Sequence, residues 1–197
     1  MPQTLLRNSP AQRSLGRRDC GEFLPVSRAA LALCRLRSVF AAVALLAGST
    51  VHAQGVVMQK NLSLDLAKTI AEAALGECRA KGFHTSVAVV DRAGQVLVLL
   101  RDEQATATTL EMAQRKAYTA RMFRMSTADF QKRTTPDQPY AGQRDVNGML
   151  ALSGGVPIRI GGEGGEVIGG VGSSGSSLEQ DDACAKAGVA KVADLLK

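Results

Sequence analysis

One stretch of the sequence carries side chains of several chemical kinds on what would be a single helix face. They recur at spacings of four and three residues, which aligns them in one stripe: Glu111, Arg115, Tyr118, Met122 and Met125. A carboxylate, a guanidinium, a phenol and two thioethers together suit the wall of a ligand pocket. The competing interpretation is that the methionines are core or oligomer contacts and that Glu111 and Arg115 form a solvated i,i+4 ion pair.

Other patterns typical of catalytic or metal sites give little support. The sequence has two histidines, His52 and His84, and no HxxxH, CxxC or paired acid–histidine spacing that would predict a metal site. Without a GxSxG motif, a Ser-His-Asp triad has little support either. General acid–base catalysis needs only two positioned groups, and Glu111, Tyr118 and Arg144 are the candidates for it.

A glycine-rich segment near the C-terminus matches the letters of a dinucleotide-binding loop. Gly170, Gly172 and Gly175 spell GxGxxG, but that fingerprint requires a following strand with an acidic residue about 20 positions later. The sequence after Gly175 is too short for this and is nearly all helix-like. We therefore interpret the glycines as turn and close-approach positions in an edge hairpin and its exit.

The first 53 residues have the organisation of an export signal. Two arginines precede an apolar run over 39–47, and small residues follow up to Ala53. A cationic flank, an apolar segment of roughly 7–15 residues and a small-residue break predict a secretory signal peptide, cleaved here after Ala53. The run is shorter than the roughly 20 residues that span a bilayer. We expect a leader over 1–53 and one periplasmic or secreted domain over 54–197, without a transmembrane segment.

Charge and cysteine content both change when the leader is set aside. Of 24 basic and 18 acidic residues, seven and two lie in 1–53, so the remainder has 17 against 16, a formal charge of +1. This balance removes the support for nucleic-acid binding through bulk positive charge. Cys20 and Cys34 fall in the leader, which leaves Cys78 and Cys184. In an oxidising compartment these are candidates for one disulfide, with two buried free thiols as the alternative.

The remaining sequence predicts four helices. Residues 62–82 repeat apolar side chains on one face, and 106–125 is rich in helix formers. A short helix follows over 126–133, and a capping box at 177–180 opens a last helix to about Leu195. Two adjacent aspartates in the first turn of that helix suit the helix dipole, which favours a structural role over catalysis.

Two hairpins separate these helices. The first joins the β-branched run 85–91 to 96–100, and the second joins 156–160 to 166–171, with the longest loop over 134–148. The resulting order is α-β-β-α-α-β-β-α. Paired hairpins with grouped helices predict an antiparallel sheet and an α+β fold.

Several segments, in matching order and spacing over about 62–196, resemble the GlcG/HbpS-like family, whose domains are often labelled haem-binding or haem-degrading. The segments that carry the resemblance are Ala88–Asp91 with Gly94, Arg115–Ala120, Gly154–Ile158, Ile168–Gly172 and Glu179–Asp181. The resemblance implies a profilin-like sandwich, a central antiparallel sheet flanked by helices, commonly assembled into homo-oligomers. In such a fold the first and last helices would pack side by side. This implies a Cys78–Cys184 disulfide, with Gly188 permitting the close approach.

The resemblance also implies a haem or a similar flat, acidic cofactor as ligand. Haem needs an apolar slot, donors for its propionates and usually an axial ligand. We expect the slot and its donors among eight residues: Arg101, Glu111, Arg115, Lys116, Tyr118, Thr119, Met122 and Arg144. If an imidazole binds the iron, the candidate is His84, although a lone histidine at a strand entrance is more often a surface residue. Tyr118 and the methionines are the fallback ligands.

Three functions are compatible with these residues. The first is an exported small-molecule-binding protein for haem or a similar cofactor. The second is a small-molecule enzyme of isomerase or lyase type acting on a carboxylate. The third is an oligomeric scaffold or sensor partner without chemistry of its own. The export signal, the family resemblance and the mixed helix stripe favour the first.

Overall fold

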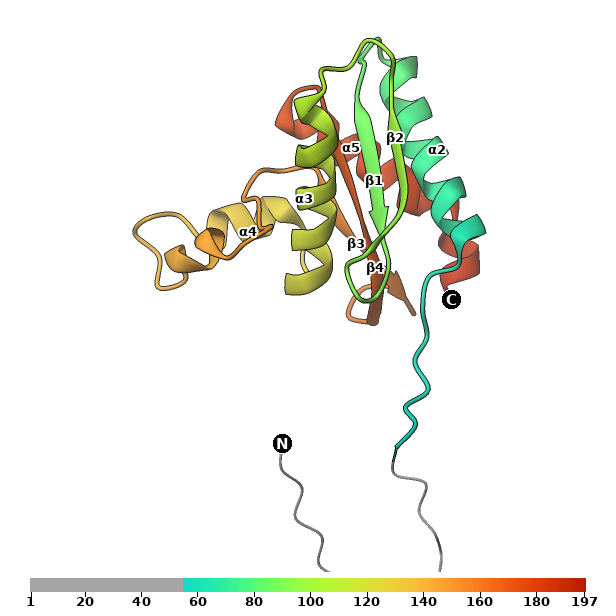
Figure 1. The fold of residues 1–197 in the computed structure, drawn as a ribbon, viewed down its shortest axis with the longest axis vertical. Coiled ribbons are helices and arrows are strands. Elements are labelled where there is room, and N and C mark those ends of the chain that lie inside the picture. The colour runs from blue at the N-terminus through green and yellow to red at the C-terminus, as the bar shows by residue number, and fades with distance from the viewer. Residues whose placement is uncertain (1–54) are drawn as a thin grey trace, which may run out of the picture. The chain divides into compact units, whose positions relative to one another are not determined.

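The computed structural model describes residues 55–197, so the predicted leader and its cleavage after Ala53 lie outside the described residues. A compact unit spans Val57–Lys197. Its elements, labelled as in Figure 1, are helix α2 (Leu64–Ala80), strands β1 (Ser86–Val90) and β2 (Val96–Arg101), helices α3 (Thr108–Phe123) and α4 (Thr127–Arg133), the 3-10 helix η1 (Ala141–Asp145), strands β3 (Gly155–Ile160) and β4 (Glu166–Ser174), helix α5 (Leu178–Lys191) and the 3-10 helix η2 (Ala193–Leu196). The predicted α+β class and element order are confirmed. Within residues 55–197 no helix has both the length and the apolar character that crossing a membrane requires.

The two hairpins join into one four-stranded antiparallel sheet, in the order β2-β1-β4-β3. β1 and β4 are therefore the inner strands, and every residue of β1 is buried. The β3–β4 hairpin lies at one edge of the sheet, as predicted, with β3 as the edge strand and the glycine-rich β4 as an inner strand. β4 runs to Ser174, three residues beyond the predicted end, because Gly170–Ser174 pair with β1.

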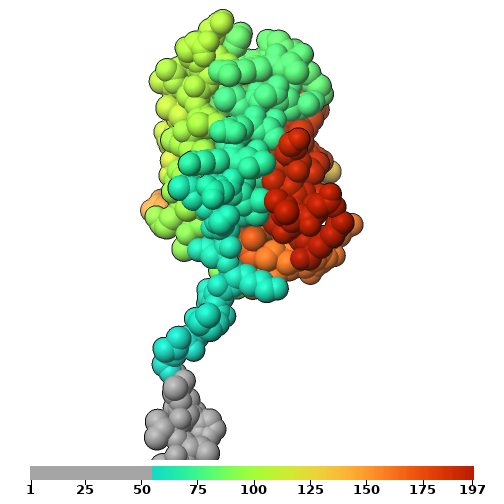
Figure 2. Space-filling view, turned by 90° about the vertical axis from the view of Figure 1, so that its right-hand side faces the viewer, coloured from blue at the N-terminus to red at the C-terminus, as the bar shows by residue number. Residues whose placement is uncertain are grey.

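Helices cover both faces of the sheet, and side-chain alternation along β1 assigns the faces. Val87 and Val89 join the core formed with α2 and α5. Ala88 and Val90 point the other way and pack with Ala113 and Ala117 of α3. Figure 2 shows α2 and the C-terminal segment lying side by side on the outside of the first face.

Two glycines of the dinucleotide-like motif, Gly170 and Gly172, are close-approach positions beneath α3. A Cβ atom on Gly172 would lie 2.2 Å from the carbonyl oxygen of Ala113, and one on Gly170 would lie 2.4 Å from that of Ala117. The helix backbone thus rests almost directly on the backbone of β4, and the fully buried alanines of α3 complete this contact. The motif therefore does not form a dinucleotide-binding loop, because α3 fills the space over Gly170 and Gly172.

A disulfide joins α2 to α5, as the family resemblance implied. Cys78 and Cys184 are bonded, with Cα atoms 5.6 Å apart and 106 positions between them in the sequence. Gly188 lies one turn further along α5, where a Cβ would come within 2.6 Å of the carbonyl oxygen of Ile70. A small residue at this position therefore allows the two helices to approach closely.

The contact between α3 and β4 can be tested with one added methyl group. We expect Gly172→Ala to lower the free energy of unfolding by about 1–3 kcal/mol or more, because α3 must move away from the sheet. In the matched control Gly76→Ala, the new Cβ at an exposed position of α2 meets nothing within 4 Å. This control should instead raise stability by about 0.5–1 kcal/mol. Urea unfolding of both variants measures the difference, and equal effects would contradict the close contact.

Candidate functional site

A cavity of about 590 Å³ lies between α3 and the turn that joins β1 to β2. From α3 it is lined by Gln114, Arg115 and Tyr118, and from the facing segments by Gly94, Gln95, Val96, Asn147 and Gly148. The helix stripe identified in the sequence therefore does form a pocket wall at two of its positions, Arg115 and Tyr118.

Tyr118 is held by two glycines. A Cβ on Gly94 would lie 2.7 Å from the ring, and one on Gly148 would lie 3.3 Å from it. Both glycines have positive φ, 81° and 83°, a conformation that favours glycine. Met122 also presses against Gly94 and so supports the turn from beneath. Met125, the last residue of the predicted stripe, is half-buried and is not part of the cavity lining.

Arg115 is fixed in the cavity wall by its terminal nitrogens. Nη2 donates to the carbonyl oxygen of Met149 at 2.9 Å, and Nη1 makes a long contact of 3.4 Å with Glu111 on the exposed rim. Its Nε is buried and has no hydrogen-bond partner among the described residues. Thr119 is a positioning residue, because its hydroxyl accepts a hydrogen bond from the Leu150 N–H and so ties the loop that bears Met149 to the helix.

His84 lies elsewhere, in a contact that orients its ring. Its Nδ1 is 3.0 Å from Oδ1 of Asp102, and its side chain is 42 % exposed. Asp102 is buried and also accepts from Nε of Arg79 at 2.6 Å and from the Gln104 N–H. The Arg79 hydrogen bond, then the Gln104 N–H and to a smaller extent His84, lower the pKa of Asp102 to about 2, although burial opposes this. With Nδ1 donating to the carboxylate, Nε2 of a neutral ring carries the free lone pair.

The structure does not bring His84 and the Tyr118 cavity together. His84 precedes the start of β1, whereas Gly94 follows its end, so the length of a five-residue strand, about 15 Å, separates them. Arg101 is at the same end as His84 and donates to the carbonyl oxygen of Ala105. Arg144, in η1, donates to Thr134 and does not line the cavity. The acid–base set of Glu111, Tyr118 and Arg144 is therefore not assembled in one cavity.

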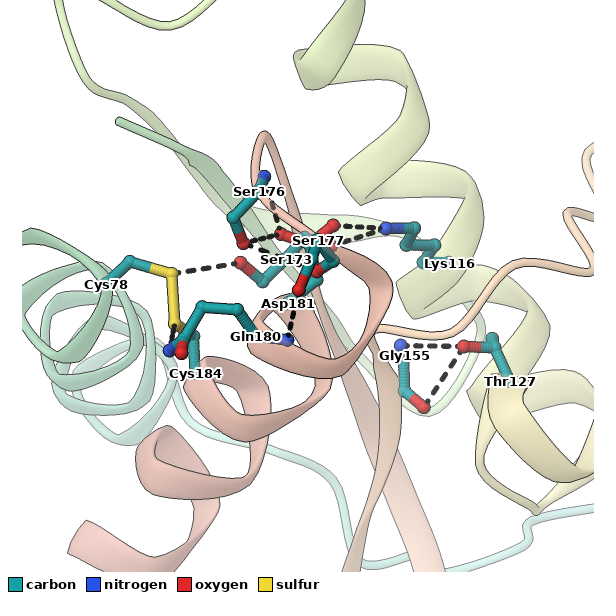
Figure 3. A network of polar contacts seen from close by, with 10 residues as sticks. All are labelled: Cys78, Lys116, Thr127, Gly155, Ser173, Ser176, Ser177, Gln180, Asp181 and Cys184. Carbon is teal, nitrogen blue, oxygen red and sulfur yellow. Dashed lines mark hydrogen bonds and ion pairs between the residues drawn. A yellow bond between two sulfur atoms is a disulfide. The ribbon is translucent and has the colours of Figure 1, made fainter. Parts of the chain in front are cut away.

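Lys116 is fully buried and serves the fold. Its Nζ donates to Oδ2 of Asp181 at 2.8 Å and to the carbonyl oxygen of Ser173 at 2.9 Å (Figure 3). Burial lowers the pKa of Lys116, and the Asp181 carboxylate opposes that shift. Oδ1 of Asp181 accepts from both the N–H and the hydroxyl of Ser176, so both groups are satisfied. The ammonium predicted for a propionate is thus already paired, and Asp181 has the structural role expected for it.

Several site features were not singled out from the sequence. Gly148 and Asn147 close the cavity from the long loop, and Asp102 orients His84. The sequence offered a weak signal for Asp102 only, an acid that directly follows a strand. No cluster of three or more His, Cys, Asp or Glu side chains that could hold a metal ion occurs among residues 55–197.

Comparison with known proteins agrees with the fold and identifies the family. Residues 62–190 match the family described as haem degrading protein HbpS-like. The chain belongs to the HbpS-like family. A curated relative, an uncharacterised 15.0 kDa protein from the dhaT-dhaS intergenic region of Citrobacter freundii, is 30% identical over 122 residues, covering 61% of this chain and 84% of the relative.

Two solved structures extend this HbpS-like assignment. The crystal structure of HbpS is 34% identical with a TM-score of 0.65, covering 72% of this chain and 97% of HbpS. The crystal structure of a PduOC:heme complex is 26% identical with a TM-score of 0.61, covering 66% of this chain and 94% of PduOC. The HbpS-like domain of this chain thus has a relative that was crystallised with haem.

The buried ion pair gives a stability prediction. We expect Asp181→Asn to lower the free energy of unfolding by about 3–5 kcal/mol, because it leaves the Lys116 ammonium buried without its charge partner. Adding Lys116→Met removes that uncompensated charge and should recover part of the loss. Urea unfolding of the single and double variants measures both effects. A double variant less stable than Asp181→Asn would contradict the account.

Asp102 gives a pH prediction. Because its folded pKa is lowered from 3.8 to about 2, its contribution to stability is present above pH 4 and is lost as the pH falls toward 2. We therefore expect Asp102→Asn to be less stable than the wild type at pH 6, with the gap closing between pH 4 and 2. Thermal unfolding across this range tests it, with Glu163→Gln, an exposed turn residue, as control. A gap that stays constant down to pH 2 would show that the loss is not electrostatic.

Proposed function

We propose that this HbpS-like protein binds haem, or a similar flat, acidic cofactor, in the cavity beside Tyr118. The observation that carries the proposal is that Arg115 and Tyr118 together form one wall of this cavity. The chain also belongs to a family described as haem degrading. The PduOC:heme complex supports the ligand class, because that relative shares the fold at 26% identity. When bound, haem would supply a redox-active iron.

The residues of the cavity fit such a ligand. Its volume of about 590 Å³ falls within the range of roughly 300–1,000 Å³ typical of cofactor pockets. Tyr118, Val96 and the two facing glycines offer apolar surface. The buried Nε of Arg115 lacks a partner among the described residues, and a guanidinium is suited to a propionate carboxylate.

The position of His84 supports the choice of a different iron ligand. Since His84 lies at the opposite end of β1, a haem in this cavity takes a different axial ligand. The phenol of Tyr118 is the one we propose, because tyrosine is an established axial ligand of haem proteins.

Export and self-association are further parts of the proposal. The signal-like segment over 39–47 supports a periplasmic or secreted location, and a disulfide in the fold suits an oxidising compartment. The edge strand β2, with Leu99 exposed on it, supports a homo-oligomer.

A hemin titration followed at the Soret band tests the proposal. We expect a saturable, shifted band with the wild type and with His84→Ala. Tyr118→Phe should lose or move the band, because the phenol oxygen is removed while the ring remains. Arg115→Gln should weaken binding about tenfold or more, through loss of a charge-assisted hydrogen bond.

The second tyrosine of the chain provides the matched control. Tyr140 lies in contact with Arg133, away from the cavity, so Tyr140→Phe should bind as the wild type does. A band lost in His84→Ala and kept in Tyr118→Phe would move the haem to the other end of β1. No spectral change with the wild type would overturn haem binding altogether.

A further inference from the structure

Four arginines from three separate segments line a second cavity, of about 360 Å³. We call them the arginine cluster: Arg92, Arg121, Arg124 and Arg159. The rest of the lining is residues 164–167, which form the end of the β3–β4 turn and the start of β4. Glu166 is the only carboxylate among these lining residues. An adjoining cavity of about 370 Å³ shares two of the four arginines. Neither cavity shares a lining residue with the one beside Tyr118.

Two members of the cluster are held in place by the protein. Arg92 donates to Glu166 at 2.5 Å and to the carbonyl oxygen of Lys60. Arg159 donates to the carbonyl oxygens of Gly165 and Arg124. Their guanidinium groups are therefore fixed beside the cavity before any ligand arrives.

The other two members have no direct ion-pair partner among the described residues. Within residues 55–197 the side chains of Arg121 and Arg124 make no ion pair and no hydrogen bond, and Nε of Arg121 is buried without a partner. Burial, followed by the nearby charges of Arg92 and Arg124, lowers the pKa of Arg121. Asp91 is the acid that opposes this, but its Oδ1 already accepts two backbone N–H groups of its own turn. Positive charge therefore exceeds negative charge here, in a domain whose charge is otherwise nearly balanced.

The backbone conformation of Arg124 also favours a role for its side chain at the cavity. This residue ends α3 in the left-handed conformation, with φ 56° and ψ 35°. Among residues 55–197, no other residue except glycine has a positive φ. Glycine is the residue favoured at such a helix end, because a side chain there costs free energy. An arginine at this position places a guanidinium at the cavity and gains no partner within the fold.

We propose that the arginine cluster binds a compact oxyanion, the phosphate or carboxylate group of a small anionic ligand. A guanidinium presents a planar fork of donors that matches both groups in bidentate geometry. Among the described residues, Arg121 and Arg124 have no partner of their own for such donors, while Arg92 and Arg159 add fixed positive charge beside them. A cavity of this size suits a single small anion, which would offset the repulsion among the arginines. The proposal does not depend on haem binding.

Calorimetric titration of the purified protein tests the site, with inorganic pyrophosphate and malonate as probes. At about 10 mM salt, where screening is weak, we expect saturable binding of at least one probe. Tighter binding of pyrophosphate would indicate a phosphorylated ligand, and tighter binding of malonate a carboxylate. Both Arg124→Gly and Arg121→Gln should weaken the binding about tenfold or more.

Arg124→Gly separates ligand binding from folding. It keeps the carbonyl that Arg159 uses and relieves the left-handed backbone, so its thermal stability should equal or exceed that of the wild type. Lys132→Gln removes one exposed positive charge on α4 and is the control for net charge. Absence of saturable binding to both probes would overturn the proposal. So would an equal loss of affinity in Lys132→Gln, which would reveal unspecific attraction.

Discussion

The closeness of α3 to the sheet is the constraint on which the rest of the molecule depends. Gly170 and Gly172 leave the surface of β4 without side chains, so the alanines of α3 lie almost on the strand backbone. This fixes both the height and the rotation of the helix. Another face of the helix, with Arg115 and Tyr118, then lies beside the β1–β2 turn at a distance that leaves a cavity. The site is therefore a consequence of how two backbones pack.

The same closeness explains how a lysine can be buried in so small a domain. Lys116 starts on the α3 side of the sheet and reaches Asp181, in the first turn of α5, whose helix covers the other side. The pair thus ties the two helical layers together at one end of β4. Replacing such a pair with apolar residues is often neutral, so its value lies in specifying one relative position of α3 and α5. We regard that specification as a hypothesis for this chain.

Local sequence patterns predicted the helices and most of the strands. The full length of β4, the burial of Lys116 and the arginine cluster depend on tertiary packing. Capping residues and periodicity gave the helices to within a few residues, and the family resemblance gave the disulfide. β4 was predicted too short because its glycines weaken the strand signal, although pairing with β1 sustains it. The burial of Lys116 depends on a partner 65 positions away, which helix periodicity cannot show. The arginine cluster was missed because its members lie in three segments that only the fold brings together.

The position of the disulfide encloses most of the domain in one covalent ring. Cys78 lies in the first helix of the domain and Cys184 in the last, so the chain between them is closed into a ring. All four strands and the long loop that bears Arg144 and Gly148 belong to this ring. A protease that cut the loop once would open the ring without releasing a fragment. The two pieces of the nicked domain would stay covalently joined through the disulfide, and their separation would require both a reductant and unfolding of the shared sheet.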